Sequence, residues 1–239
     1  MKTAVIIPAA GKSTRMGTQK QLMVLGKVPV LARTLAAFEG HADVDEIILA
    51  TSKDVAEAIG AFGYKKGHEK IIAVTEGGSS RQESVYAALK CVSPGVDNIL
   101  IHDGARPLVG WQTISDVLAY VRRGLCAASG VISKDTVKIV GEDNIVKATP
   151  DRGSTWLVQT PQGFPYEVIK EAHKRARSDG FVGTDDATLV ERIGVSVYMV
   201  EGDYQNIKLT TPDDFEIAEV LLERYCLEKI EIAKALIHK

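Results

Sequence analysis

The chain has 239 residues, of which 45% are hydrophobic and 25% are charged. A chain of this size and apolar content can bury a substantial core, which excludes intrinsic disorder and favours a single domain over two independent ones. The net charge of -2 lacks the basic excess of proteins that bind nucleic acid or anionic membranes, so any phosphate site must be local.

The cysteines Cys91, Cys126 and Cys226 show no C-x-x-C spacing, which excludes a disulfide framework and the common zinc modules. The apolar residues 3–10 run straight into Lys12, a pattern more typical of a buried strand than of a signal peptide. No stretch approaches the ~20 apolar residues that a membrane helix needs. We therefore expect a cytoplasmic protein with neither a membrane nor a nucleic acid as partner.

The first part of the chain alternates between strand-like and helix-like segments. Short β-branched runs lie at 4–7, 46–51, 71–75 and 98–102, and each is followed by a Gly, Ser or Pro break and a segment with helical periodicity. This alternation predicts an α/β fold with a mostly parallel sheet and helices on both faces. Ligands of such sheets bind at the carboxyl ends of the strands, so the loops there are the candidate functional segments.

The alternation fails from about 134 to 160, where residues 136–140 and 144–148 flank Gly141-Glu-Asp143. This pattern predicts a β-hairpin arm inserted into the α/β frame.

Beyond the arm, helical periodicity resumes at 166–177 and again after Thr184, and a strand is expected at 195–200. The last helix is predicted to open at Thr211-Pro-Asp-Asp214, because proline and acids suit the first turn.

The loop after the first strand reads Pro8-Ala-Ala-Gly-Lys-Ser-Thr-Arg-Met-Gly17. It is neither a P-loop nor a dinucleotide fingerprint, because Ile6 and Ser13 stand where those motifs require glycine. Small residues with exposed backbone N–H groups, together with Lys12, Arg15 and Lys20 near a helix N-terminus, nevertheless suit a polyphosphate. The alternative is an ordinary turn of small residues with solvated cations.

Loops at other strand ends add to this pattern. Residues 77–84, Gly-Gly-Ser-Ser-Arg-Gln-Glu-Ser, offer further backbone donors, with an ordinary helix cap as the alternative. Residues 102–107, His-Asp-Gly-Ala-Arg-Pro, place an acid and a guanidinium where a substrate would lie. The pair Asp185-Asp186 is more typical of a helix cap than of a metal site.

Several motifs then occur in a specific order. They are Pro8-Ala-Ala-Gly with Arg15-Met-Gly, Gly77-Gly with Arg81 and Ser84-Val, His102-Asp-Gly-Ala-Arg-Pro107, Lys134-Asp-Thr-Val-Lys138, Gln159-Thr-Pro-Gln162, Gly183-Thr-Asp-Asp186 and Asn206-Ile-Lys-Leu-Thr210. Over roughly residues 3 to 220 this set resembles the 2-C-methyl-D-erythritol 4-phosphate cytidylyltransferase family of the non-mevalonate isoprenoid pathway. Pro-Ala-Ala-Gly alone would indicate only a nucleotidyltransferase.

The resemblance implies a Rossmann-like nucleotidyltransferase fold and the transfer of CMP from CTP to 2-C-methyl-D-erythritol 4-phosphate, with release of pyrophosphate. It also implies Mg²⁺ as cofactor, bound mainly through the CTP phosphates, with no metal ligand assigned in the protein. The attacking phosphate monoester is already anionic near neutral pH, so no general base is required. The protein then has to position two anions and stabilise the charge that develops on the α-phosphate.

The resemblance assigns site residues in three groups. The catalytic group comprises the transition-state cations Arg15 and Lys20, with Arg152 and Lys208 positioning the substrate phosphate. The CTP-binding group comprises Ala9, Ala10, Gly11, Gly78 and Ser84. The acceptor-binding group comprises Asp103, Arg106, Thr136, Thr160 and Thr184.

In this family the arm clasps a second subunit and contributes to its site, so the resemblance implies a homodimer. Thr136, Arg152 and Thr160 lie on or near the arm, and we expect the arm to span about 134–160.

The sequence also departs from the family pattern. Arg15 and Lys20 are only five positions apart, a shorter connection than is usual, and Ser80 stands where an acid is frequent. Beyond about Tyr225 a C-terminal extension over about 225–239 is expected to lengthen the final helix, packed on the body or on a partner subunit.

Two alternatives stay open at this stage. A cytidylyltransferase for another polyol phosphate, such as ribitol 5-phosphate, would differ only in the acceptor pocket. A non-catalytic nucleotide-sensing module is disfavoured, because a sensor would not need acceptor cations such as Arg106 and Lys208.

Overall fold

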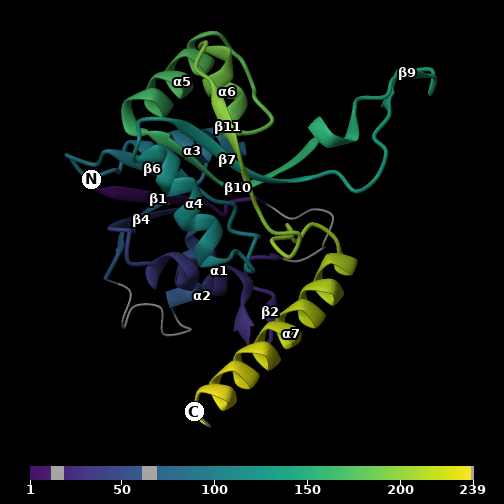
Figure 1. Cartoon of the computed structure of the whole chain (residues 1–239). Helices are drawn as coiled ribbons and strands as arrows, with labels where there is room; N and C mark the ends of the chain where they lie inside the picture. The colour runs from purple at the N-terminus through teal and green to yellow at the C-terminus, as the bar shows by residue number, and fades with distance from the viewer. Residues whose placement is uncertain (12–18, 61–68, 238–239) are drawn as a thin grey trace.

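A central sheet of seven strands, in the order β11-β7-β10-β6-β1-β4-β5, organises the molecule (Figure 1). The computed structural model describes residues 1–11, 19–60 and 69–237, and the side chains of the last helix as far as Arg224. The strands of the sheet are β1 (Thr3–Pro8), β4 (Glu46–Thr51), β5 (Ile71–Glu76), β6 (Asn98–Ile101), β7 (Cys126–Ile132), β10 (Trp156–Pro165) and β11 (Val197–Glu201).

The sheet is mostly parallel, as the alternation of strands and helices predicts. β1 runs parallel to β4 and β6, β4 to β5, and β7 to β11. Only β10 among these strands is antiparallel to its neighbours, β6 and β7. The strands expected at 4–7, 46–51, 71–75 and 98–102 are all present, each within one residue at either end.

Helices cover both faces of the sheet, and β1 shows how they are held. Val5 and Ile7 point into a core with helices α1 and α4, whereas Ala4 and Ile6 point into a second core with α3, α5 and α6. A strand covered on both faces is apolar at successive positions, which explains the continuous apolar run. The helices are α1 (Val30–Glu39), α2 (Lys53–Ile59), α3 (Arg81–Leu89), α4 (Trp111–Val121), α5 (Tyr166–Ser178), α6 (Asp186–Arg192) and α7 (Pro212–Ile237). A short hairpin of β2 (Val24–Leu25) and β3 (Val28–Pro29) precedes α1.

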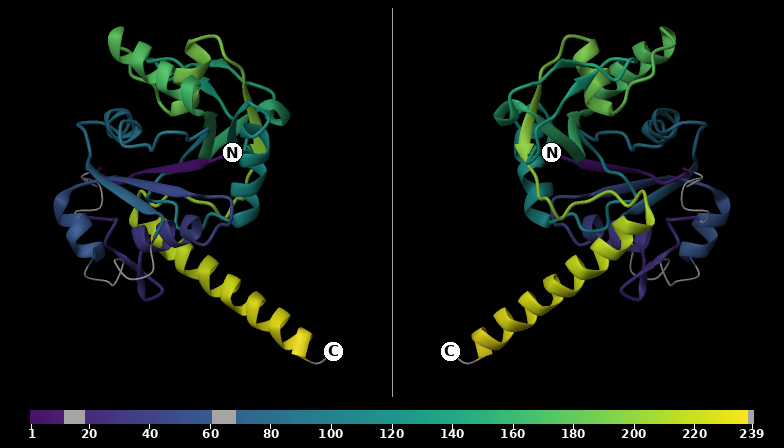
Figure 2. Two further views of the ribbon diagram at one scale, coloured as in Figure 1. Left: turned by 90° about the vertical axis from the view of Figure 1, so that its left-hand side faces the viewer. Right: turned by 90° about the vertical axis from the view of Figure 1, so that its right-hand side faces the viewer.

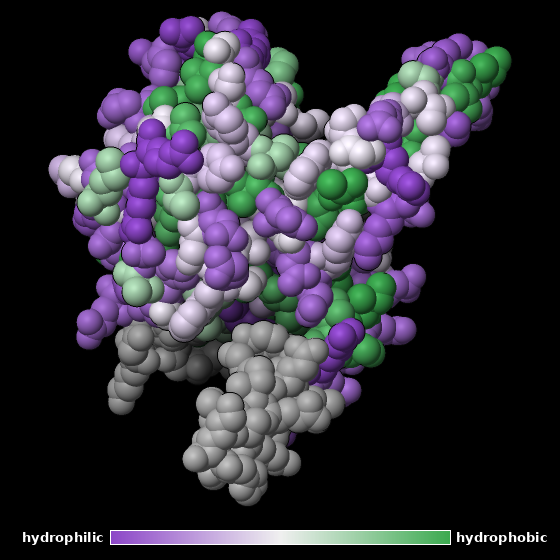
Figure 3. Space-filling model, viewed as in Figure 1, coloured by the Kyte–Doolittle hydropathy of each residue, from purple (hydrophilic) through white to green (hydrophobic). Residues whose placement is uncertain are grey.

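A hairpin of β8 (Ile139–Val140) and β9 (Val146–Ala148) occupies the place of the predicted arm and projects from the body (Figure 1). Apolar side chains are exposed near its tip, among them Ile139 and Ile145 (Figure 3). The arm ends earlier than the expected residue 160. After the short 3₁₀ helix η2 (Arg152–Ser154), β10 begins at Trp156 and pairs with β7 of the central sheet.

The last helix begins at Pro212, as predicted, and the Asp214 carboxylate accepts hydrogen bonds from the backbone N–H groups of Thr210 and Thr211. Phe215 and Leu222 of its first turns pack on a small apolar cluster of the body. The helix then continues to Ile237 and extends away from the sheet (Figure 2). No helix in the described part of the chain is both long and apolar enough to cross a membrane.

Candidate active site

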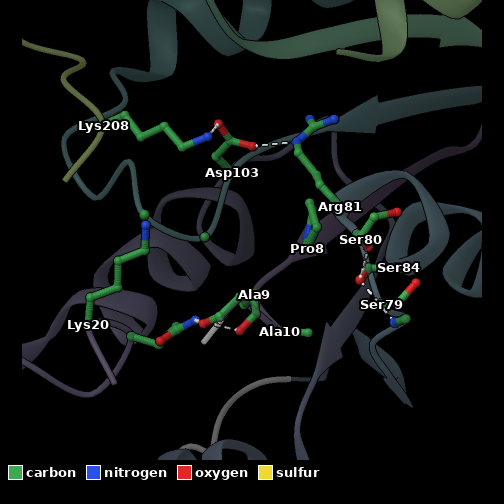
Figure 4. Close-up of a pocket in the computed structure, with 15 residues that line it drawn as sticks. Pro8, Ala9, Ala10, Lys20, Ser79, Ser80, Arg81, Ser84, Asp103 and Lys208 are labelled. Atoms are coloured by element: carbon green, nitrogen blue, oxygen red, sulfur yellow. Dashed lines mark hydrogen bonds and ion pairs between the residues drawn. The ribbon is translucent and has the colours of Figure 1, made fainter. Parts of the chain in front are cut away.

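A cavity of about 550 Å³ opens at the carboxyl ends of the parallel strands (Figure 4). Three loops build it, those that follow β1, β5 and β6. Residues of α3 and of the segment before α7 complete the lining. The lining residues are Pro8, Ala9, Ala10, Gly11, Lys20, Gln21, Gly78, Ser79, Ser80, Arg81, Ser84, Asp103, Gly104, Ala105 and Lys208. Lys20 and Lys208 lie on one side of this cavity, and Ser79, Ser80 and Ser84 lie on the opposite side (Figure 4).

A second cavity of about 390 Å³ adjoins the first. Its lining includes Arg106 and Thr160, together with Thr184 just before α6. Arg81, Asp103 and Lys208 line both cavities. Ligands in the two cavities would therefore meet at a wall made of two cations and one carboxylate.

Gln21 holds the loop that follows β1. Its side-chain Nε2 donates to the backbone oxygens of Ala9 and Gly11, both at 2.8 Å, and its side chain is buried. The Ala9 oxygen also accepts from the Thr51 hydroxyl at 3.1 Å. Ala9 and Gly11 are thus held by side-chain hydrogen bonds, and those to Ala9 come from two different segments of the chain.

The loop after β5 is shaped by its serines and glycines. Ser80 caps α3 by accepting from the Glu83 N–H, and the Ser84 hydroxyl donates to the Ser80 oxygen at 2.8 Å while accepting from the Gly78 N–H at 3.1 Å. A Cβ at Gly77 would overlap the Ala10 side chain. Close approach of the two loops therefore requires glycine at this position.

Asp103 is the centre of the wall that both cavities share. Its Oδ1 lies 2.8 Å from Arg81 Nε, and its Oδ2 lies 2.8 Å from Lys208 Nζ and 3.6 Å from Arg106 Nε. Burial alone would raise the pKa of the Asp103 carboxyl, but the charges of Arg81 and Lys208 outweigh burial and hold the pKa well below its ordinary value. Asp103 is therefore ionised at neutral pH and orients cations rather than transferring protons.

A buried hydrogen-bond chain supports Asp103 from behind. The Asp103 N–H donates to Thr160 Oγ1 at 3.0 Å, Thr160 Oγ1 lies 3.1 Å from His102 Nδ1, and His102 Nε2 lies 3.1 Å from the Arg106 oxygen. Burial lowers the pKa of His102 to about 4, so its imidazole is neutral at pH 7. The neutral tautomer that fits both hydrogen bonds of His102 carries its proton on Nε2, which donates to the Arg106 oxygen, and accepts from the Thr160 hydroxyl at Nδ1.

Most of the expected site residues come together in the two cavities. Ala9, Ala10, Gly11, Lys20, Gly78 and Ser84 line the first cavity, Asp103 and Lys208 line both, and Arg106, Thr160 and Thr184 line the second. Thr160 reaches the site from the central sheet, where the β10–β7 register shifts between Val158 and Gln162, and not from the arm.

Two expected residues lie elsewhere. Thr136 and Arg152 are exposed on the arm and line neither cavity of their own subunit, and Arg152 Nη1 donates to the Lys134 oxygen at 3.4 Å. Arg15 lies outside the described residues.

Sequence reasoning missed Gln21 and assigned no role to Arg81, although Arg81 stands in one of the quoted motifs. Of the acidic pair, Asp185 is the cap of α6 that the sequence predicts, with the Thr188 N–H donating to it at 2.9 Å. Asp186 is instead buried and contacts Arg81.

Comparison with known proteins agrees with this geometry. The sequence model of the 2-C-methyl-D-erythritol 4-phosphate cytidylyltransferase family matches residues 3–224. The protein of that name from Desulforamulus reducens is 46% identical over 224 residues, covering 92% of this chain and 95% of the relative. The protein of that name from Clostridium botulinum strain Okra is 41% identical over 225 residues, covering 93% of this chain and 98% of the relative.

Solved structures agree as well. The crystal structure of 4-diphosphocytidyl-2C-methyl-D-erythritol synthase from Anaerococcus prevotii superposes with a TM-score of 0.83 at 31% identity, covering 93% of this chain and 98% of that one. The 2-C-methyl-D-erythritol 4-phosphate cytidylyltransferase from Thermus thermophilus gives a TM-score of 0.74 at 35% identity, covering 92% and 98%. With the ordered motifs, the nucleotidyltransferase-like fold and nearly full-length similarity in agreement, this chain belongs to the 2-C-methyl-D-erythritol 4-phosphate cytidylyltransferase family.

Proposed function

We propose that the first cavity binds CTP and the second binds 2-C-methyl-D-erythritol 4-phosphate, so that the enzyme transfers CMP between them in isoprenoid precursor biosynthesis. The observation that carries this assignment is the wall of Arg81, Asp103 and Lys208 that both cavities share. A nucleotide and an acceptor phosphate bound on its two sides would lie next to each other, as direct transfer requires.

In the proposed reaction, an oxygen of the acceptor phosphate attacks the α-phosphorus of CTP in line. A new P–O bond forms, the bond between the α-phosphorus and the bridging oxygen breaks, and pyrophosphate leaves with that electron pair. The products are 4-diphosphocytidyl-2-C-methyl-D-erythritol and pyrophosphate. Neither Asp103, with its low pKa, nor His102, whose ring nitrogens are both hydrogen-bonded, is suited to act as a base, and an anionic nucleophile needs none.

The positions of the described cations support this assignment of CTP to the first cavity and the acceptor to the second. Lys20 lines only the first cavity, where a triphosphate would lie. Arg106 lines only the second, where the acceptor phosphate would lie, and Lys208 lines both. We assign Lys20, together with Arg15, to the charge that builds on the α-phosphate, and Lys208 to the acceptor phosphate.

Mg²⁺ would enter as part of the substrate, bound to the CTP phosphates. Both oxygens of the Asp103 carboxylate face cations, and in the described part of the chain no three His, Cys, Asp or Glu side chains gather in a group suited to a metal. The metal would therefore take most of its ligands from CTP and water.

We further propose that the enzyme is a cytoplasmic homodimer in which the arm completes the site of the partner subunit. Thr136 and Arg152 are exposed on an arm that projects from its own body, and the arm also exposes apolar residues such as Ile139 and Val140 (Figure 3). An exposed apolar arm is typical of an interaction site, and an arginine on it suits a phosphate.

The experiment that tests the function measures pyrophosphate release with CTP, UTP, ATP and GTP against a panel of polyol phosphates. CTP with 2-C-methyl-D-erythritol 4-phosphate should be the best pair. A faster reaction with ribitol 5-phosphate would move the assignment to that acceptor, and binding of CTP without turnover on any acceptor would favour a nucleotide sensor.

A further inference from the structure

A buried acid, Asp186, stands behind the shared wall and lines neither cavity described above. It is the first residue of α6, and its side chain is 1% exposed. Asp186 Oδ2 lies 2.6 Å from Arg81 Nη1, and Oδ1 lies 2.9 Å from His173 Nε2. His173 is a residue of α5, and its side chain is fully buried. The carboxylate is thus held between a residue of the active site and a residue of the core.

Arg81 links this acid to the reacting region. Its guanidinium contacts Asp186 through Nη1 and Asp103 through Nε, the latter at 2.8 Å. Asp103 in turn contacts Lys208, so a continuous chain of charges runs from the core to the wall of both cavities.

Asp186 and Arg81 both stay charged at neutral pH. Burial would raise the pKa of Asp186, but Arg81 and His173 hold it below its ordinary value. Burial would lower the pKa of Arg81, but Asp186 and Asp103 raise it above its ordinary value.

The position of Asp103 explains why such a chain is needed. A carboxylate at the meeting point of two anionic ligands repels both, and it is useful only when its orientation toward its cations is fixed. Arg81 can fix it because a planar guanidinium bonded to two carboxylates from different elements has little freedom to rotate. Without the Asp186 carboxylate, Arg81 would lose one of these two anchors and could swing together with Asp103.

We propose that Asp186 is a positioning residue for CMP transfer: through Arg81 it fixes the Asp103 carboxylate and the Lys208 ammonium at the boundary between the two cavities. This inference rests on the proposed function, because it takes the boundary to be the place of reaction. It assigns Asp186 no contact with either substrate.

The first test is Asp186→Asn, which keeps the size of the side chain and removes its charge. We expect kcat/KM for the acceptor to fall about 10- to 100-fold, because displacements of about 1 Å at a reacting centre have effects of this size. The Kd of CTP, measured by calorimetry in the absence of acceptor, should change by less than about threefold, since most of the first cavity is untouched. An unchanged kcat/KM for the acceptor would overturn the proposal, as would an equal loss in CTP affinity.

The matched control is Glu46→Gln. Glu46 is also an acid that is 2% exposed and paired with a cation, Lys2 at 2.7 Å, but it begins β4 at the opposite end of the strands from the site. We expect it to lower thermal stability as Asp186→Asn does while leaving kcat/KM for both substrates unchanged. A comparable loss of activity in Glu46→Gln would show that the effect of Asp186→Asn is one of general stability.

Arg81→Lys keeps the test decisive if Asp186→Asn fails to fold. The Arg81 side chain is 26% exposed, and a lysine retains its charge but cannot bridge both acids with the geometry of a guanidinium. It should reproduce the acceptor-specific loss, and adding Asp186→Asn to it should cost no more than about twofold further. Independent, multiplicative losses in the double variant would mean that Asp186 does not act through Arg81. Wild-type enzyme that releases no pyrophosphate with any acceptor in the same assay would instead refute the proposed function.

Discussion

Lys208 Nζ lies 2.8 Å from Asp103 Oδ2, so the cation assigned to the acceptor phosphate is oriented by an acid from a different segment of the chain. Asp103 follows β6, whereas Lys208 precedes α7 by only a few residues. The site therefore depends on the relative placement of two segments more than 100 residues apart.

The pairing predicts a difference between the two substrates. Lys208→Ala should lower kcat/KM for the acceptor on the order of 10²- to 10³-fold, the scale for removing a preorganised charge donor, and change the Kd of CTP much less. Steady-state kinetics with each substrate varied in turn would measure the split. Lys2→Ala, which removes another lysine paired with a buried acid, is the control and should leave both parameters unchanged.

The cations assigned to the α-phosphate should act mainly on kcat. Arg15→Ala and Lys20→Ala should reduce kcat on the order of 10²- to 10³-fold or more with smaller effects on CTP binding, because they act on charge that develops in the transition state. Arg15→Lys should retain partial activity, because the lysine ammonium keeps the positive charge but cannot form the two parallel hydrogen bonds of a guanidinium. Single-turnover measurements at saturating CTP would report this directly, and near-normal turnover of Lys20→Ala would remove Lys20 from the reaction.

The contact between Gly77 and Ala10 makes a prediction about the first cavity. Gly77→Ala would push the new Cβ into the Ala10 side chain and displace a loop assigned to CTP. Overpacking of this kind costs about 1–3 kcal/mol, or roughly a 5- to 150-fold loss in kcat/KM for CTP if the strain falls on the site. Gly110→Ala, where the added Cβ meets nothing within 4 Å, should have no such effect and serves as the control.

His102 gives the molecule a measurable dependence of stability on pH. Its pKa is about 4 in the folded protein, below the ordinary value of 6.5, because burial disfavours the imidazolium. Below pH 6.5 the unfolded chain therefore binds a proton that the folded chain does not, so the free energy of unfolding falls as the pH drops from about 6.5 to 4. The full loss is on the order of 3 kcal/mol.

His102→Gln isolates this contribution, because glutamine can accept from Thr160 and donate to the Arg106 oxygen but does not titrate. Urea unfolding at several pH values should give a shallower slope between about pH 6.5 and 4.5 for the variant than for the wild-type enzyme. Equal slopes would mean that His102 is not the titrating group. The depressed pKa values of Asp103 and Asp186 act at lower pH, since their stabilisation is lost only as the pH falls below the ordinary carboxyl range.

The sequence predicts most of the sheet and the loops of the first cavity, because buried parallel strands leave a clear apolar pattern and their carboxyl ends must converge. It fails where a residue's role depends on distant parts of the chain. Asp185-Asp186 satisfies a capping pattern with its first member, and nothing local shows that the second turns inward to meet Arg81, 105 positions away.

The role of Gln21 and the position of Thr160 in the fold escaped sequence analysis for related reasons. The partners of Gln21 are backbone oxygens, which carry no sequence signal. Thr160 follows a stretch without regular alternation, which resembles the end of the arm, although β10 has already joined the central sheet by pairing with β7. Register shifts of this kind depend on the neighbouring strand rather than on the local sequence.

The proposed sharing of sites between subunits makes the most specific prediction, because Lys20 lines a cavity of the body whereas Arg152 lies on the arm. Lys20→Ala and Arg152→Ala should each be nearly inactive alone. In a mixed two-fold dimer, one site combines both defects and the other receives Lys20 and Arg152 intact. Random pairing after joint unfolding and refolding makes half of the dimers mixed, with half of their sites whole, so roughly one quarter of wild-type activity should return.

A dual-tag pull-down would verify that mixed dimers form. If they form and remain as inactive as the separate variants, Arg152 acts within its own subunit and the arm does not complete the partner's site.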